Sequence, residues 1–239
     1  MIYLEALYNF FNEIFENLYY SLIYEDRYLY ILEGLGNTII MALFATVIGV
    51  LLGTLIALII NANIHTGKFR FLRRICDFYV LIIRGTPVLL QLMIIYYVIF
   101  KSVNINIILV GIIAFGLNSS AYVSEIIKSG IISIDKGQFE ASNVLGLNYV
   151  QTMYYVVLPQ AIRNILPALG NEFITLLKET SVAGYIGICE LTKASDIIAS
   201  RTYDYFFPLI IIAIIYFTMT YFLSKLINVM ERKLNNVRS

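Results

Sequence analysis

The chain has 239 residues, of which 59% are hydrophobic and only 14% charged, and its formal net charge is +1. A soluble domain usually carries about 25% charged residues, so this chain lacks the polar side chains to cover its surface in water. The composition favours a membrane protein, and the near-neutral charge excludes a basic surface for nucleic acid. One histidine, His65, and two distant cysteines, Cys76 and Cys189, leave no spacing typical of a metal site.

Residues 1–34 precede the first long apolar run and are rich in Tyr and Phe. A signal peptide begins with positive residues followed by an apolar core, and this segment does the opposite. We therefore expect an acidic, aromatic segment at the membrane surface on the extracytoplasmic side. Its charged residues are Glu5, Glu13, Glu16, Glu25, Asp26 and Glu33, with Arg27 as the single base.

Five apolar runs are long enough to cross a bilayer, whose core of roughly 30 Å requires about 20 apolar residues in a helix. Backbone groups in hydrocarbon must be satisfied within the segment, so each run is expected to be helical. The sequence thus predicts an all-α membrane protein with five transmembrane helices. The runs are Ile39 to Ile60, about Phe78 to Phe100, about Ile107 to Ile127, about Met153 to Leu177, and Phe206 to Leu223.

The first run has small residues at every fourth position, which lie on one face of a helix. Such a face allows a second helix to approach closely, so we expect it to pack inside the protein. The four residues are Ala45, Gly49, Gly53 and Ala57.

Lysine and arginine concentrate in three places that alternate to the same side of the membrane. The loops after the first and third runs and the C-terminal segment hold four, two and four of them, against five on the other side. Because short cytoplasmic loops carry the excess of basic residues, we expect the N-terminus outside and the tail, residues 230–239, in the cytoplasm. The transmembrane domain then covers residues 35–229, in the cell membrane.

The loop between the third and fourth runs, residues 134–159, has the most informative pattern. Residues 138–145 can form about two helical turns, and Gly146 is suited to end them because glycine adopts the left-handed backbone. Pro159 follows near the start of the next run, where a proline in the first turn costs least. We expect a short cytoplasmic helix bounded by glycines.

The spacing of this loop resembles the EAA loop of ABC importer permeases. Glu140-Ala141-Ser142 is followed after three residues by Gly146, and after nine more by Val156, Leu158 and Pro159. The family pattern has Ala and Ile where this chain has Ser142 and Val156. The resemblance implies a type I permease fold in which this coupling helix docks on a separate ATPase subunit. The coupling residues it implies are Gly137, Gln138, Glu140, Ala141, Ser142 and Gly146.

Further motifs resemble those of polar amino acid permeases over about residues 35–229. They are Arg84-Gly85-Thr86-Pro87 with Gln91, Ala121-Tyr122 with Glu125, Leu158-Pro159-Gln160-Ala161, and Lys178-Glu179-Thr180-Ser181, where the family usually has Asp after Lys. This implies import of a polar amino acid such as histidine, arginine, glutamine, glutamate or cystine. It also implies three partners: a pair of ATPase subunits that bind ATP and Mg²⁺, an extracytoplasmic solute-binding protein, and a second permease subunit.

Charged residues inside a bilayer are costly and usually face the bundle interior or a water-filled path. For Arg84, Glu125 and Arg163 we favour ion pairs or snorkelling at the inner gate, together with Gly85, Thr86, Pro87 and Pro159; solute contact is the alternative. Asn118, Ser119 and Ser120 fit helix–helix hydrogen bonds or the lining of a solute path. Glu172 and Lys178 are candidates for an outward-facing path, because a zwitterion needs one group of each sign.

The sequence contains no GxxxxGK[ST] phosphate loop and no motif of a hydrolase or dehydrogenase. We therefore expect a transport subunit that is not an enzyme and binds no cofactor or metal itself. Two other classes remain: a secondary transporter or channel for a small polar solute, and a membrane enzyme of lipid metabolism. The first often has an inverted repeat, which this sequence lacks, and the second would need clustered Asp, His or Arg.

Overall fold

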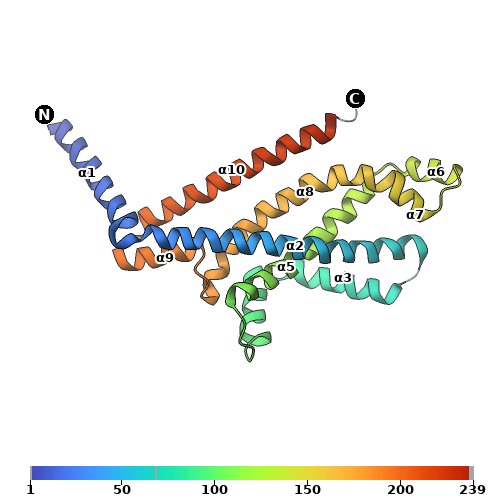
Figure 1. Cartoon of the computed structure of the whole chain (residues 1–239), viewed down its shortest axis with the longest axis horizontal. Coiled ribbons are helices and arrows are strands. Elements are labelled where there is room, and N and C mark those ends of the chain that lie inside the picture. The colour runs from blue at the N-terminus through green and yellow to red at the C-terminus, as the bar shows by residue number, and fades with distance from the viewer. Residues whose placement is uncertain (1, 68, 237–239) are drawn as a thin grey trace.

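The computed structural model describes residues 2–67 and 69–236, and in these ranges every regular element is a helix. Figure 1 shows an elongated bundle whose longest helix, α2 (Tyr28–Thr66), extends along most of its length. Lys68 and the last three residues of the expected tail lie outside the described residues.

The N-terminal segment is divided by a tight turn. Helix α1 (Ile2–Leu22) leads into the short helix η1 (Tyr24–Asp26), in which Glu25 and Asp26 have φ angles of 54° and 53°. Two consecutive non-glycine residues in the left-handed region are unusual and change the direction of the chain. Residue 34, the expected boundary of the transmembrane domain, lies within α2. Near it, Asn37 donates to the Cys189 carbonyl and Thr38 Oγ1 accepts from Leu191 N at the start of α9.

Three described helices are long and apolar enough to cross a membrane: Tyr24–Ile64, Ile107–Ile132 (α5) and Phe206–Leu234, the main part of α10 (Phe206–Asn236). They contain the first, third and fifth expected spans. The second expected span is broken between α3 (Arg70–Gly85) and the segment Val88–Ile99, which is formed by α4 (Val88–Ile94) and η2 (Ile95–Ile99). The chain bends by 109° at this break. Counted as one span, this pair raises the number to four.

The fourth expected span corresponds to α8 (Leu158–Glu179), which follows α7 (Tyr149–Thr152) and η3 (Met153–Val157). Helix α8 is not among the helices apolar enough to count as a candidate span, because it contains charged residues and Pro167. The five-span count therefore stays a prediction. Between α8 and α10 lie η4 (Thr180–Ile186) and α9 (Leu191–Thr202).

The small-residue face of the first span packs against α5, as expected. A Cβ atom added to Gly49 would lie 2.8 Å from Ser119 Oγ, and one added to Gly53 would lie 2.7 Å from the Ser120 carbonyl oxygen. Ala45 and Ala57 are fully buried on the same face. Close backbone approach at these glycines brings the middle of α5, with its polar residues, into the centre of the bundle.

Large apolar side chains cover the outside of the bundle. On α10, Phe206, Phe217 and Phe222 are 64–69% exposed, as a lipid-facing helix requires and a water-soluble one would not tolerate in such number. Figure 1 places α1 and α9 at one end, whereas α6 (Lys136–Val144), α7 and the C-terminal end of α10 lie toward the other. The segments in which basic residues concentrate thus lie toward the same end.

Candidate functional site

Helix α6 begins and ends at well-formed caps. The Asp135 side chain accepts a hydrogen bond from Gly137 N at 2.6 Å. At the other end Gly146 has φ of +78°, and the amides of Gly146 and Leu147 donate to the carbonyls of Asn143 and Ser142. These two bonds and the left-handed glycine form a Schellman motif, which closes the helix firmly. The expected short helix is present as Lys136–Val144, so it begins two residues and ends one residue before the predicted range of 138–145.

The surface of α6 and the following turns is exposed and partly apolar. Glu140 and Ala141 are exposed, while Val144 and Leu145 are 88% and 78% exposed. An apolar patch of this kind at the end of a bundle is typical of a protein-binding surface. Ser142 differs, because it is buried and donates to the Gln138 carbonyl at 2.7 Å. Its small side chain therefore serves contacts within the chain.

The break between α3 and α4 is organised by Gln91. Thr86 and Pro87 interrupt the helix and free backbone carbonyls, which must find donors in an apolar environment. The Gln91 amide nitrogen lies 2.7 Å from the Ile83 carbonyl oxygen, 3.0 Å from that of Thr86 and 2.8 Å from Thr86 Oγ1. The Arg-Gly-Thr-Pro sequence with a glutamine four residues later is thus one structural unit, a capped bend.

Arg84 and Glu125 form the expected ion pair across α3 and α5. Their closest N and O atoms are 3.8 Å apart, and Lys128 also approaches Glu125 at 3.1 Å. The Arg84 guanidinium lies 5.6 Å from the centre of the Tyr122 ring. The side chains are 46% and 30% exposed, so the pair borders open space. Arg163, predicted to act in the same way, forms no salt bridge with any described residue.

That open space is a groove of about 560 Å³ between α3, α5 and α8. Arg84 and Glu125 line it from one side, and Asn164 and Glu172 line it from α8. Lys178 is exposed and does not line this groove. Six residues correspond to about 600° of helical rotation, so Glu172 and Lys178 point in different directions. Glu172 therefore lines the same groove as Arg84, and the expected pairing of Glu172 with Lys178 is not seen.

The polar residues in the middle of α5 all make contacts between or within helices. Asn118 donates to Gln91 Oε1 at 2.9 Å, Ser119 donates to Glu172 Oε1 at 3.0 Å, and Ser120 lies 2.8 Å from the Tyr79 hydroxyl. These contacts agree with the helix–helix interpretation. Glu172 lines the groove, and the hydrogen bond from the buried Ser119 holds its carboxylate in place.

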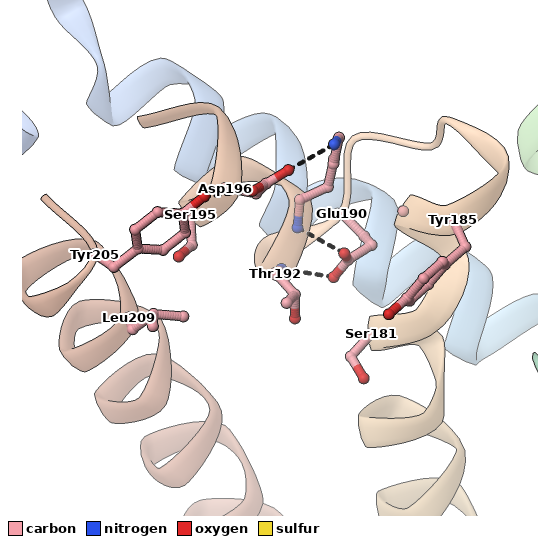
Figure 2. A pocket seen from close by; sticks show the side chains of 10 residues that line it. Ser181, Tyr185, Glu190, Thr192, Ser195, Asp196, Tyr205 and Leu209 are labelled. Atoms are coloured by element: carbon pink, nitrogen blue, oxygen red, sulfur yellow. Dashed lines mark hydrogen bonds and ion pairs between the residues drawn. The ribbon is translucent and has the colours of Figure 1, made fainter. Parts of the chain in front are cut away.

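A second pocket, which the sequence analysis missed, lies near the end of the bundle that contains α9. It has a volume of about 410 Å³, and η4, α9 and the start of α10 line it. Figure 2 shows Ser181 and Tyr185 on one side and Ser195, Tyr205 and Leu209 on the other. Lys193 and Asp196 pair at 2.7 Å at its edge.

Glu190 is the charged residue at the base of this pocket. It is fully buried and accepts hydrogen bonds from the amides of Thr192 at 2.6 Å and Lys193 at 2.7 Å, as the N-cap of α9. Burial raises the pKa of Glu190 to about 7, although these hydrogen bonds act in the opposite direction. The signal available in the sequence was an acidic residue directly before a helix, which by itself predicts only a cap.

Comparison with known proteins identifies the family. Residues 49–236 match the model of the binding-protein-dependent transport system inner membrane component, and the chain belongs to this family. It is 39% identical over 217 residues to the putative glutamine transport system permease protein of Rickettsia bellii, covering 90% of this chain and 97% of the relative. It is 41% identical over 209 residues to the arginine transport system permease protein ArtQ of Bacillus subtilis, covering 87% and 93%.

Solved structures agree with the fold. A chain from a crystal structure of an amino acid ABC transporter with histidines has a TM-score of 0.80 and 45% identity, covering 85% of this chain and 94% of that one. The MetNI methionine ABC transporter in an inward-facing conformation has a TM-score of 0.70 at 19% identity, which supports the fold alone. The resemblance drawn from the loop spacing is thereby confirmed. The chain is a multi-pass membrane permease, a transport component of the ABC class.

Proposed function

We propose that this chain is the permease subunit of an ATP-driven importer that moves a polar amino acid across the cell membrane by alternating access. The observation that carries the proposal is α6: a capped, exposed helix with the EAA spacing, standing at the end of a bundle of apolar helices. The relatives named for glutamine and arginine transport support a polar amino acid as the solute.

The energy comes from partners. A pair of ATPase subunits binds ATP and Mg²⁺. These subunits contact α6 at Gly137, Gln138, Glu140 and Ala141. Gly146 fixes the end of the helix and Ser142 its contact with the rest of the chain. A solute-binding protein delivers the solute from outside, and a second permease subunit completes the path. In this orientation α6 faces the cytoplasm and α1 the outside, which agrees with the distribution of basic residues.

The solute path follows the polar side chains on α5 and α8. In the groove, Glu172, which accepts a hydrogen bond from Ser119, supplies a carboxylate for the ammonium group of an amino acid. Asn118, the neighbour of Ser119 on α5, is part of the same proposed path. Arg84 is the group of opposite sign in that groove, a role that the sequence analysis gave to Lys178. Glu125 holds Arg84, and the bend at Gly85, Thr86 and Pro87 and the helix start at Pro159 shape the inner gate.

The coupling role is tested with the complex reconstituted in liposomes. Glu140→Ala removes an exposed charge from α6, and Gly146→Val forces a branched residue into a left-handed backbone, which costs about 1–2 kcal/mol. Both variants should lower solute-stimulated ATPase activity and uptake together. Asn12→Ala, an exposed change on α1 at the other end, should leave both unchanged. Stimulation that survives both α6 variants would remove the coupling role.

The alternative is a secondary transporter or channel for a small polar solute. It predicts uptake by the purified chain alone in liposomes with an ion gradient and no nucleotide. The present proposal predicts that this preparation is inactive until the ATPase subunits and ATP are supplied.

A further inference from the structure

Two arginines that lie 174 positions apart in the sequence line the same cavity at the C-terminal end of α1. Arg27 and Arg201 line one cavity of about 350 Å³ between the end of α1, η1 and the end of α9. Both belong to the small set of basic residues on the side of the membrane that is otherwise poor in them. Because a guanidinium group presents several donors to a phosphate or carboxylate, two of them in one cavity favour an anionic ligand.

The Arg27 side chain is almost completely buried but its hydrogen bonds are incomplete. Its side chain is 7% exposed, with Nη1 donating to the Tyr20 carbonyl at 2.7 Å and Nη2 3.1 Å from Glu25 Oε2. Its Nε atom is buried without an acceptor in the described part of the chain. A buried donor without a partner is costly. Because Arg27 also lines the cavity, its guanidinium group has unused hydrogen-bonding capacity beside that space.

Arg201 is exposed and stacks over the Tyr30 ring at 5.0 Å. It forms no ion pair within the described ranges. The acids nearby are Asp204, whose Oδ1 accepts a bond from Phe206 N at 2.8 Å, and Glu25, which is 54% exposed and paired with Arg27. Because these two carboxylates offset part of the positive charge, charge alone would bind an anion weakly, and the ligand needs further contacts. Asn17 and Tyr24 line the cavity as well.

The surroundings of the cavity have the character of a membrane–water interface. Tyr19, Tyr20, Tyr24 and Tyr28 are 39–51% exposed, and Tyr203 is 95% exposed. Tyrosines collect at the depth of the lipid headgroups, because their rings are amphipathic. These exposed tyrosines around the cavity place the guanidinium groups of Arg27 and Arg201 at the depth of the lipid phosphates.

Helix α1 continues the lipid-facing surface beyond the cavity. Leu7, Phe11 and Phe15 are 56–73% exposed and share one face of the helix, whereas Glu13 and Glu16 lie on the opposite face. The exposed tyrosines of η1 and the start of α2 join this face to the outer surface of the spans. Acyl chains of a lipid held at the cavity can cover the apolar face of α1, and a free anion cannot.

We propose that the cavity between α1, η1 and α9 binds the phosphate group of a membrane phospholipid between Arg27 and Arg201, and that this lipid holds α1 against the membrane surface. The ligand class is a phosphodiester that carries acyl chains. The left-handed turn at Glu25 and Asp26 sets the direction of α1. With this direction, the apolar face of α1 contacts the acyl chains of the lipid whose phosphate the two arginines bind.

The test uses the complete transporter complex, delipidated in a sugar-based detergent. Dioleoylphosphatidylglycerol is titrated back, and bound lipid is counted by native mass spectrometry while the melting temperature is followed. Two further probes distinguish the source of the anion: dioleoylglycerol, which lacks the phosphate, and inorganic phosphate, which lacks the acyl chains. Arg201→Gln is compared with Lys101→Gln, an exposed basic residue in the turn before α5.

Arg201→Gln should weaken binding of the phospholipid about tenfold, as expected for a lost charged hydrogen bond, while Lys101→Gln leaves it within about twofold. Arg27→Gln should act in the same direction, and because Arg27 is buried, the exposed Arg201 variant carries the test if the other does not fold. Equal lipid binding by the Arg201 and Lys101 variants overturns the proposal. Stabilisation by dioleoylglycerol equal to that by the phospholipid, or by inorganic phosphate alone, also overturns it.

Discussion

The side-chain amide of Asn118 on α5 donates to Gln91 Oε1 at 2.9 Å, and Gln91 in turn donates to the carbonyls freed at the Thr86–Pro87 break. Both side chains are buried. One chain of hydrogen bonds therefore joins α5, the central helix of the bundle, to the bend between α3 and α4.

This network predicts a strong dependence of stability on Gln91. Gln91→Leu should lower the free energy of unfolding by about 2–3 kcal/mol, because buried carbonyls lose their donors. Asn118→Ala should cost less, since it removes one bond and an Oδ1 atom that is already without a partner. A double-mutant cycle measured by thermal unfolding in detergent should give a coupling energy of about 1 kcal/mol. Additive effects would show that the two side chains act separately.

Close packing of α2 on α5 makes Gly53 sensitive to the smallest substitution. A Cβ atom there would lie 2.7 Å from both the Ser120 carbonyl oxygen and the Val123 side chain. Gly53→Ala should therefore destabilise the protein by about 1–3 kcal/mol, as overpacking does. Gly36→Ala in the same helix is the matched control, since nothing lies within 4 Å of its added Cβ. It should be neutral or slightly stabilising, so similar melting temperatures for the two variants would contradict the packing account.

The Arg84–Glu125 pair should matter more for transport than for stability. Its atoms are 3.8 Å apart and both side chains are partly exposed, so the pair is worth less than about 1 kcal/mol. Arg84→Gln and Glu125→Gln should thus unfold near the wild-type temperature while uptake by the reconstituted complex falls. A large loss of stability with full uptake per folded complex would instead show a purely structural pair.

The buried Glu190 predicts a pH dependence of stability. Its pKa in the folded protein is raised to about 7 from 4.5, so the folded state binds the proton more tightly than the unfolded state. Stability is then greatest below about pH 4.5 and declines as the pH rises toward 7, by an amount on the order of 3 kcal/mol from this group.

Glu190→Gln should remove this component, which is measured as the difference in melting temperature between pH 5 and pH 8. Asp196→Asn is the comparison, because the pKa of Asp196 is lowered by the hydrogen bond from Lys193 and the carboxylate stays ionised over that range. If Glu190→Gln and wild type show the same pH dependence, the carboxyl group of Glu190 remains charged in the folded protein.

Local patterns were sufficient for much of the architecture. The uncharged run Ile39 to Ile60 and the small residues at every fourth position specify a membrane helix with a packing face, since both follow from helical geometry alone. The same holds for α6, where Gly146 has the backbone freedom that the cap requires. The family could be inferred from the spacing of Glu140, Gly146 and Pro159, because these residues lie within one short segment whose helix and caps are encoded locally.

Contacts between distant segments could not be read in this way. The sharp break at Pro87, the groove that Glu172 lines and the cavity shared by Arg27 and Arg201 depend on how helices pack, and hydrophobic packing is non-directional along the chain. Glu172 and Arg84 line one groove because α3, α5 and α8 converge there, whereas Lys178 on the same helix does not line it. The sequence determined the membrane environment, most of the helices and the short capped helix α6, and the tertiary structure alone decided which charged residues share a groove.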